Sequence, residues 1–425
     1  MPESDWRETL ARVRKASKSP AVVSALNGMT HSYNFSPDHI APAVPDQNLT
    51  AQDMNEKAKI LEELLSDLLP SINDQLNSLL SSLDLIDLDK SPEPDYVSTL
   101  EILSVLDQTL QSVVSSIVFL TLNSPLPDEK HDHGLKNLKI YRCSHLRNKV
   151  EALIVDIISN RLFPTCASFV EFSALSTVCT QHHGVWNEVS RTREEIHMIV
   201  TDAQRTIKKT INWARKFDWA MIQEAWLLSS DLFDIILELF TRAINPASRS
   251  IPEDDPTTTN NLNNENAAIE LLAQLAKSTI PLLKLGRILV KRTLEWISKN
   301  LVFRINTEVN SEALEQLRKV YKLIIVPLED LGQLLGILQL RNRAINVENQ
   351  PNIQRSVLNL TEAMNSCLAV LDSYLLPFLD EDKGDSDKPH FESLFPTLRN
   401  LWDKASANLM GVVLSFEFER IAIGV

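Results

Sequence analysis

Apolar residues recur three and four positions apart through most of this chain, the spacing that places them on one side of an α-helix. From Ile60 to Leu83, leucine and isoleucine keep this phase for more than six turns. Comparable patterns predict helices at about residues 53–83, 95–122, 135–163, 165–180, 184–217, 219–244, 267–303, 309–346, 351–376 and 391–422. The predicted fold class is therefore all-α.

Stretches without this pattern divide the helices into two groups. Residues 251–266 hold two prolines, five asparagines and four acids but no base. They offer little apolar surface to bury, so we predict a flexible, acidic, Asn/Thr-rich linker over 246–266. The expected architecture is two antiparallel helical bundles, an N-terminal domain over 52–245 and a C-terminal domain over 267–425.

Two further segments lack the helical pattern over most of their length. Residues 1–51 contain Pro20, Pro37, Pro42 and Pro45 among polar residues and are predicted to form a loosely ordered arm, in which only Trp6 to Lys18 reads as a helix. An acidic loop is expected at 380–390 within the C-terminal domain.

Six prolines follow apolar residues inside or beside the predicted helices. Proline removes a backbone hydrogen bond and crowds the carbonyl four residues earlier, unless it lies in the first turn of a helix. We therefore expect kinks or helix starts at these positions, which are Pro70, Pro164, Pro281, Pro327, Pro377 and Pro396.

Composition narrows the classes of function. Only 9 glycines occur in 425 residues, which argues against glycine-rich phosphate loops and an all-β fold. A net charge of −14 opposes general binding to nucleic acid or to anionic lipid, because both attract basic surfaces. Four irregularly spaced cysteines suit a reducing compartment, and residues 1–23 lack the apolar core of a signal peptide. A cytoplasmic or nuclear location is expected, without secretion.

One segment is long and apolar enough to raise the question of a membrane span. Residues 101–122 would cross a bilayer as a helix, but Glu101, Asp107, Gln108 and Gln111 interrupt them. The apolar residues lie in one stripe, which is typical of a helix packed on protein. No membrane span is therefore expected.

The densest group of reactive side chains is CTQHHGVWN at 179–187, with Cys179, His182 and His183. A zinc site needs three or four ligands, and no second close pair accompanies this one apart from His131 and His133. The following Gly184 suggests instead that a helix ends here, with a histidine facing its terminal carbonyls. No metal is predicted.

Recognised catalytic patterns are missing from the sequence. Glu194 and His197 share a helix face, but the di-iron pattern needs two such pairs and two further glutamates, so a surface Glu–His contact is expected. There is no P-loop, Gly-x-Ser-x-Gly or His-Glu-x-x-His motif. We predict no catalytic residue, no cofactor and no enzymatic activity.

Two groups of residues could contact a partner protein. Trp219 and Trp226 are seven residues apart, which favours a shared position in a core, with an exposed aromatic groove as the alternative. Residues 277–304 carry seven bases and one acid, and Lys284, Arg287 and Lys291 follow helical spacing. These three either pair with acids of the same chain or bind an acidic partner. Ile288 is assigned to the apolar side of that helix.

Three stretches resemble an expanded family of uncharacterised helical proteins of rust fungi. They are LLPSINDQLNSLLSSLDL at 68–85, KTINWARKFDWAMIQEAW at 209–226 and STIPLLKLGRILVKRTLEW at 278–296. The likeness covers most of the chain after residue 50 and implies no function.

A more distant similarity is to the cyclin-D-interacting protein family. It rests on SSIVFLTLNSPLP at 115–127, the acidic segment before STIPLLKLGRILV, and VPLEDL at 326–331, which occur in that order. The resemblance implies two helical domains separated by an acidic loop, and a regulator without catalytic activity.

The function expected from these patterns is non-enzymatic protein–protein interaction with an unidentified partner protein. Three alternatives stay open: a cyclin-D-interacting-like regulator of the cell cycle or transcription, a host-directed fungal effector, and a helical enzyme with an unrecognised site using Glu194 and His197. The sequence does not set the oligomeric state.

Overall fold

The protein is seen here as a computed structural model. It describes residues 18–35, 51–86, 92–121, 130–178, 183–244, 259–300, 309–340, 350–375 and 388–423. Within these ranges every regular element is a helix, and the helices lie close to the predicted segments. The all-α fold class is confirmed.

The chain divides into two compact units, Met1–Lys216 and Phe217–Val425. This division lies about thirty residues before the boundary predicted between 52–245 and the linker. The helix assigned to a different unit than predicted is α9 (Asp218–Ile244). It packs along α10 (Thr259–Asn300) and α12 (Lys322–Leu340). The boundary predicted after residue 245 therefore falls between α9 and α10, which both belong to the second unit.

The predicted acidic segments lie partly outside the described residues. Of the linker predicted over 246–266, residues 246–258 are not described, while 259–266 belong to α10. The C-terminal end of that predicted linker is thus helical. Of the acidic loop predicted at 380–390, residues 380–387 are not described, and α14 (Lys388–Ile423) begins at Lys388.

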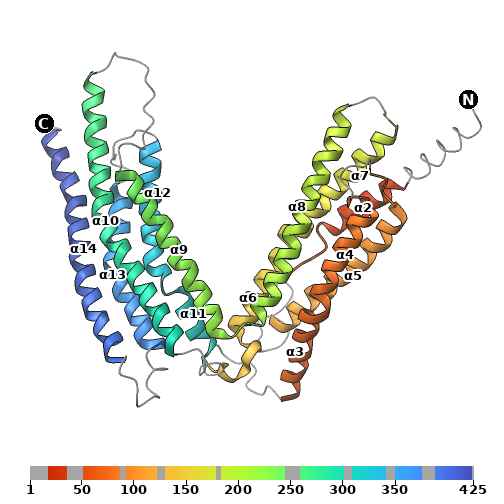
Figure 1. The fold of residues 1–425 in the computed structure, drawn as a ribbon, viewed down its shortest axis with the longest axis horizontal. Coiled ribbons are helices and arrows are strands. Elements are labelled where there is room, and N and C mark those ends of the chain that lie inside the picture. Colours follow the sequence, from red (N-terminus) through yellow and green to blue (C-terminus); the bar gives the residue numbers. More distant parts are fainter. Residues whose placement is uncertain are drawn as a thin grey trace, which may run out of the picture. The chain divides into compact units, whose positions relative to one another are not determined.

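The first unit is a bundle of helices that pack side by side (Figure 1). In it, α2 packs on α7 and α5, α4 packs on α5 and α8, and α7 packs on α8. The elements are α2 (Ser19–Met29), α3 (Ala51–Glu63), η1 (Leu64–Leu68), α4 (Leu69–Ser82), α5 (Tyr96–Thr121), η2 (His133–Leu138), α6 (Ile140–Glu151), η3 (Ala152–Leu162), α7 (Phe163–Val178) and α8 (His183–Ala214).

Helix α2 corrects the prediction that residues 1–51 form a loosely ordered arm. Its residues Val22, Leu26 and Met29 are buried in the core of the first unit, followed by Tyr33 and Phe35. The Tyr33 hydroxyl donates a hydrogen bond to Asp107 Oδ1 on α5, at 2.7 Å. Residues 1–17 and 36–50, including most of the predicted helix Trp6–Lys18, lie outside the described residues.

The prolines show two ways of staying within a helix. Pro281, Pro327 and Pro396 lie inside α10, α12 and α14. Pro70 and Pro164 each follow a π-helical stretch, η1 and η3. A π-helix bonds each N–H one residue further back, which relieves the crowding that proline causes in an α-helix. Pro377 lies outside the described residues.

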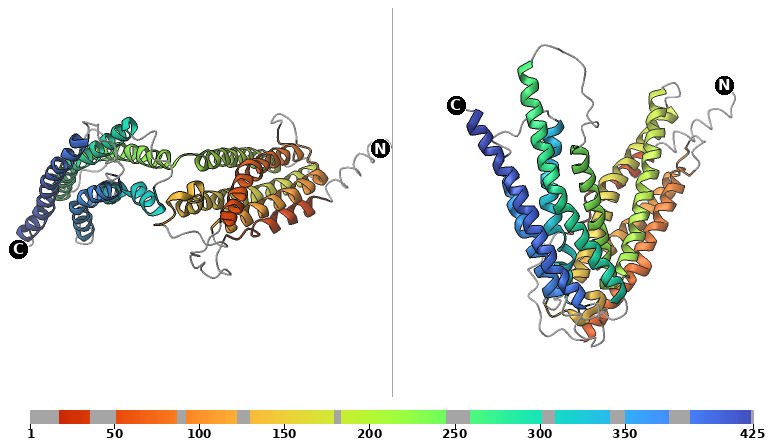
Figure 2. Two further views of the ribbon diagram at one scale, coloured as in Figure 1. Left: turned by 90° about the horizontal axis from the view of Figure 1, so that it is seen from below. Right: turned by 60° about the vertical axis from the view of Figure 1, so that its left-hand side comes forward.

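The second unit is a ring of long helices around one apolar core. Helix α10 lies between α9 and α14, and α12 lies between α9 and α13, which in turn packs on α14 (Figure 2). The remaining elements of this unit are α11 (Ser311–Lys319) and α13 (Gln350–Tyr374). The predicted helix 309–346 is thus two helices, α11 and α12, in the structure.

Glycine lets α9 approach its neighbours closely. A Cβ atom on Gly286 of α10 would lie 2.7 Å from two ring carbons of Phe233, which is fully buried. We expect Gly286→Ala to lower the free energy of unfolding by about 1–2 kcal/mol, because overpacking outweighs the gain in helix propensity. Urea unfolding measures this change.

The matched control for this prediction is Gly411→Ala in α14. No atom lies within 4 Å of a Cβ at Gly411, which is exposed. This variant should gain about 0.5–1 kcal/mol from helix propensity alone. Equal gains for Gly286→Ala and Gly411→Ala would show that Phe233 moves aside freely.

Candidate partner-binding surface

The three predicted partner-binding bases on α10 do not share one environment. Lys284 and Lys291 are exposed on the outer side of the helix. Arg287 is half-buried at the contact with α9, where its Nε lies 2.6 Å from Oδ1 of Asp234. The sequence left two alternatives for these bases, and for Arg287 the structure shows the first, pairing with an acid of the same chain. Partner binding by Lys284 and Lys291 stays a prediction.

The position of Ile288 differs from the expectation. It was assigned to the apolar side of α10, but the structure leaves it exposed, between Lys284 and Lys291 in helical spacing. The side chains that do pack inward here are those of Leu282, Leu283, Leu289 and Val290. An isoleucine flanked by two lysines is thus available at the surface of α10.

The tryptophans of α9 lie in the core, as the seven-residue spacing predicted. Trp226 is fully buried, Trp219 is nearly so, and their rings meet edge to face. Trp226 Nε1 donates a hydrogen bond to the Leu317 carbonyl of α11 at 2.7 Å. A second ring contact joins Trp226 to Tyr321. The alternative of an exposed aromatic groove at these two tryptophans is wrong.

The opposite side of α9 carries an exposed apolar stripe that the sequence did not reveal. It consists of Leu228, Leu232, Ile235 and Leu239, whose exposed fractions range from 38% to 62%. The spacings of four, three and four residues place them in one line along the helix. We call this line the α9 stripe. A line of this kind is the pattern with which helices pack on other helices.

Acidic residues border the α9 stripe along one edge. Glu224, Asp231 and Glu238 are exposed and follow one another at intervals of seven residues. Glu238 pairs with Arg242 one turn later on the same helix. The stripe and its acidic edge together resemble one half of a helix–helix interface, with apolar a and d positions beside charged g positions.

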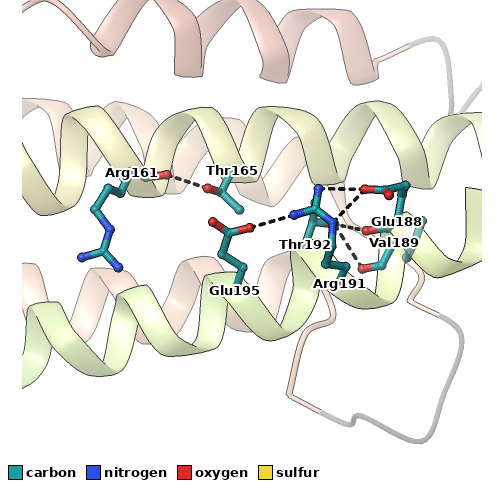
Figure 3. A network of polar contacts seen from close by, with 7 residues as sticks. All are labelled: Arg161, Thr165, Glu188, Val189, Arg191, Thr192 and Glu195. Carbon is teal, nitrogen blue, oxygen red and sulfur yellow. Dashed lines mark hydrogen bonds and ion pairs between the residues drawn. The ribbon is translucent and has the colours of Figure 1, made fainter. Parts of the chain in front are cut away.

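A polar network on the first unit offers no comparable surface. Figure 3 shows Arg191 of α8 between Glu188 and Glu195, while the Thr165 hydroxyl of α7 donates to the Arg161 carbonyl. Arg161 also lies 3.4 Å from Asp202 of α8. These side chains are largely exposed, and such ion pairs contribute little to stability. We interpret them as a solvated helix face.

The histidines and cysteines singled out from the sequence do not come together in the described part of the chain. Cys179 and His182 lie outside it, and α8 begins at His183, so Gly184 lies in a first turn rather than at the predicted helix end. His197 Nε2 lies 2.6 Å from the Leu85 carbonyl, and this contact replaces the expected one with Glu194. Among the described residues, no three potential metal ligands cluster.

Three described cysteines are buried thiols. Burial raises the pKa of Cys143 and of Cys166 to about 12, and it raises the pKa of Cys367 further. A thiol is a nucleophile only as its thiolate, so these three are poor candidates for covalent chemistry.

Two stretches of the described chain are long and apolar enough to cross a membrane by length and composition, Tyr96–Thr121 and His133–Ser176. Core helices of globular proteins pass the same test. In α5 the apolar line is buried in the first unit, as the one-sided stripe predicted; it comprises Leu103, Leu106, Leu110, Val113 and Ile117. The expectation of no membrane span stays a prediction.

Two family models match the chain, one on each unit. Residues 57–215 match a family described as Domain of unknown function (DUF8723), and residues 217–411 match one described as Domain of unknown function (DUF8721). Their limits agree with the division of the structure after Lys216. No curated protein and no solved structure matches the chain. The matches support two helical domains and assign no activity.

Proposed function

We propose that this chain is a non-enzymatic protein that binds a partner protein through the outer face of α9. The observation that carries the proposal is the α9 stripe, four large apolar side chains exposed in one line. Single exposed apolar residues are common on protein surfaces, but a contiguous line costs free energy in water unless another surface covers it.

The neighbouring part of α10 extends this surface in the proposal. Lys284, Ile288 and Lys291 are exposed on the helix that packs beside α9. The partner would thus meet apolar, acidic and basic groups across two adjacent helices, and such variety gives selectivity. The similarity to the cyclin-D-interacting family, if it extends to function, implies the same kind of role.

The experiment compares two full-length variants in cells of the source organism. Leu228→Gln combined with Ile235→Gln removes two exposed apolar side chains from the α9 stripe. The matched control, Val97→Gln with Val105→Gln, removes two exposed apolar side chains from α5 of the first unit. All four positions are exposed, so both variants should keep the circular dichroism and melting curve of the natural chain.

Proximity labelling with quantitative mass spectrometry then measures which proteins lie near the natural chain and near each variant. We expect specific proteins labelled by the natural chain to be lost from the α9 variant and retained by the α5 variant. Equal retention by both variants, or labelling no greater than that of an unrelated helical protein, would contradict the proposal.

A further inference from the structure

The α9 stripe has the spacing of one helix of a two-helix coiled coil. Its d positions are Leu228 and Ile235, and its a positions are Leu232 and Leu239. In the same register Asp231 and Glu238 occupy g positions along one edge of the stripe. The e positions on the other edge, Ser229 and Ile236, are buried in the second unit. A matching helix therefore needs apolar a and d residues, with bases on the one edge that meets Asp231.

The outer side of α10, in the same unit, carries a matching pattern. Pro281 and Ile288 are exposed and seven residues apart, and we assign them to d positions. Leu285, which is half-buried, then occupies an a position. Lys284 and Lys291 follow at g positions, and both are exposed. Helix α10 thus has an apolar line with a basic edge, whereas α9 has an apolar line with an acidic edge.

We propose that α10 of a second copy of this chain packs antiparallel on the α9 stripe. This inference rests on the proposed function, because it names a partner for the same surface. Within one copy, α9 and α10 pack through their inner sides, which include Phe233 and Gly286. The contact between copies uses the outer sides of both helices, so the fold of each copy is unchanged.

The register of this contact follows from the spacing of both sequences. In an antiparallel pair, an a residue of one helix lies beside a d residue of the other. At one end of the contact, Leu228 lies beside the aliphatic stem of Arg292, whose charged end stays in water. The three apolar contacts that result between the copies are Leu232 with Ile288, Ile235 with Leu285, and Leu239 with Pro281.

Charge selects the antiparallel orientation. Antiparallel helices bring their g positions together, so this register places Asp231 beside Lys291 of the second copy. A parallel helix would bring Asp231 against an e position of α10 instead. The e residues of α10, Leu282 and Leu289, are apolar and buried in their own unit. Only the antiparallel arrangement therefore gives Asp231 a basic partner.

A second pair of opposite charges follows one heptad later. Glu238 comes opposite Lys284 of the second copy. Glu238 already pairs with Arg242 on its own helix, so it gains less from the contact. Asp231 and Lys291 are therefore the charges whose reversal is most informative.

The same rule disfavours α9 of a second copy as the occupant of the stripe. Two antiparallel α9 helices would bring the acidic g edges together, and like charges at an interface repel. Two parallel ones would place each acidic edge against e residues that are buried in the second unit. The acidic edge of α9 is thus complementary to the basic edge of α10 and not to itself.

The contact joins two different faces, and this has a consequence for assembly. A pair of copies leaves one α9 stripe and one outer side of α10 uncovered, so further copies can add. Contacts of this kind give a ring if the rotation between copies closes, and an open chain of copies otherwise. A foreign helix with the same pattern would compete with α10 for the α9 stripe.

The test is a charge exchange in the purified full chain, with sedimentation velocity as the measure of self-association. We expect the natural chain to associate as its concentration rises. Asp231→Lys and Lys291→Glu should each lower the association constant by about three- to tenfold, because each replaces an exposed ion pair with two like charges. The two changes combined in one chain should restore the constant, and so should an equimolar mixture of the two variants.

The control is Lys404→Glu, which reverses an exposed lysine on α14 of the same unit, outside both helices of the contact. It should leave the association constant unchanged. All of these positions are exposed, so every variant should keep the circular dichroism of the natural chain.

A second pair of variants tests whether two different faces meet. Leu232→Lys disables the α9 side, and Ile288→Lys disables the α10 side. Each variant alone should stay monomeric, because every contact needs both sides. A mixture of the two should form a dimer and nothing larger, because only α10 of the first variant and α9 of the second remain intact.

A natural chain that stays monomeric at every concentration, or single losses that the charge exchange fails to rescue, would overturn the proposal. No foreign protein is present in this experiment, so its failure leaves the test of the proposed function in cells unaffected. Partner loss from the α9 variant in cells, together with a monomeric purified chain, would mean that the stripe binds foreign helices only.

Discussion

Replacement of Trp226 by alanine is expected to lower the free energy of unfolding of the second unit by about 3–5 kcal/mol, the range for removing a large aromatic side chain from a core. Trp226 is fully buried, and its ring contacts those of Trp219 and Tyr321. The variant loses these contacts and leaves the Leu317 carbonyl without the donor at 2.7 Å. That carbonyl still accepts the backbone N–H of Val320, but at 3.4 Å, so the loss of its shorter hydrogen bond adds to the cost of the cavity.

This variant also tests where the two units divide. The sequence placed Trp226 in an N-terminal domain over 52–245, whereas the structure places it in the unit that begins at Phe217. Trp402 lies in the second unit under either division; it is fully buried, and its Nε1 donates to the Leu360 carbonyl at 2.8 Å. Trp402→Phe should destabilise the second unit. The calorimetric transition that this substitution lowers is therefore the unfolding of that unit.

The expected calorimetric result is that Trp226→Ala and Trp402→Phe shift the same transition downward. Leu227→Ala is the control, because Leu227 is adjacent to Trp226 but exposed, and it should change stability by less than about 0.5 kcal/mol. If Trp226→Ala instead lowered the transition of the first unit, the boundary predicted after residue 245 would be correct.

The positions of the helices could be predicted because they depend on local spacing. The helix expected at 95–122 is α5, Tyr96–Thr121, and the one expected at 351–376 is α13, Gln350–Tyr374. The assignment of helices to units could not be predicted in this way. It depends on contacts between residues far apart in sequence, such as Gly286 of α10 with Phe233 of α9.

The α9 stripe was missed because α9 is apolar on two sides. Phe233 and Phe240 lie on the buried side, while Leu228 and Ile235 lie on the exposed side. A periodicity of apolar residues shows that a helix has an apolar side, but with two such sides it does not show which one the fold covers. The basic residues of α10 were found from charge alone, yet only the structure separates Arg287, paired with Asp234, from the exposed Lys284.

Replacement of Arg142 by methionine is expected to destabilise the first unit by about 2–5 kcal/mol, the cost of leaving buried polar groups without their charged partner. Arg142 lies on α6 and is almost fully buried. Its Nη2 donates hydrogen bonds to the carbonyls of Ala214, at 2.7 Å, and Lys216, at 2.8 Å. No pattern in the sequence distinguished this arginine from the exposed ones.

The reason for so large an effect is the position of these carbonyls: Ala214 is the last residue of α8, and Lys216 follows two residues later. The last carbonyls of a helix have no partner within it, and they form the negative end of its dipole, so a buried guanidinium satisfies both needs. Arg215→Met is the matched control, because Arg215 is exposed. Its Nη2 lies 3.8 Å from Oε1 of Glu62, which is also exposed. It should cost about 1 kcal/mol or less. Hydrogen exchange should show loss of amide protection in the last turn of α8 for Arg142→Met alone, with α9 unchanged. Equal losses in both variants would mean that the end of α8 is held by something other than Arg142.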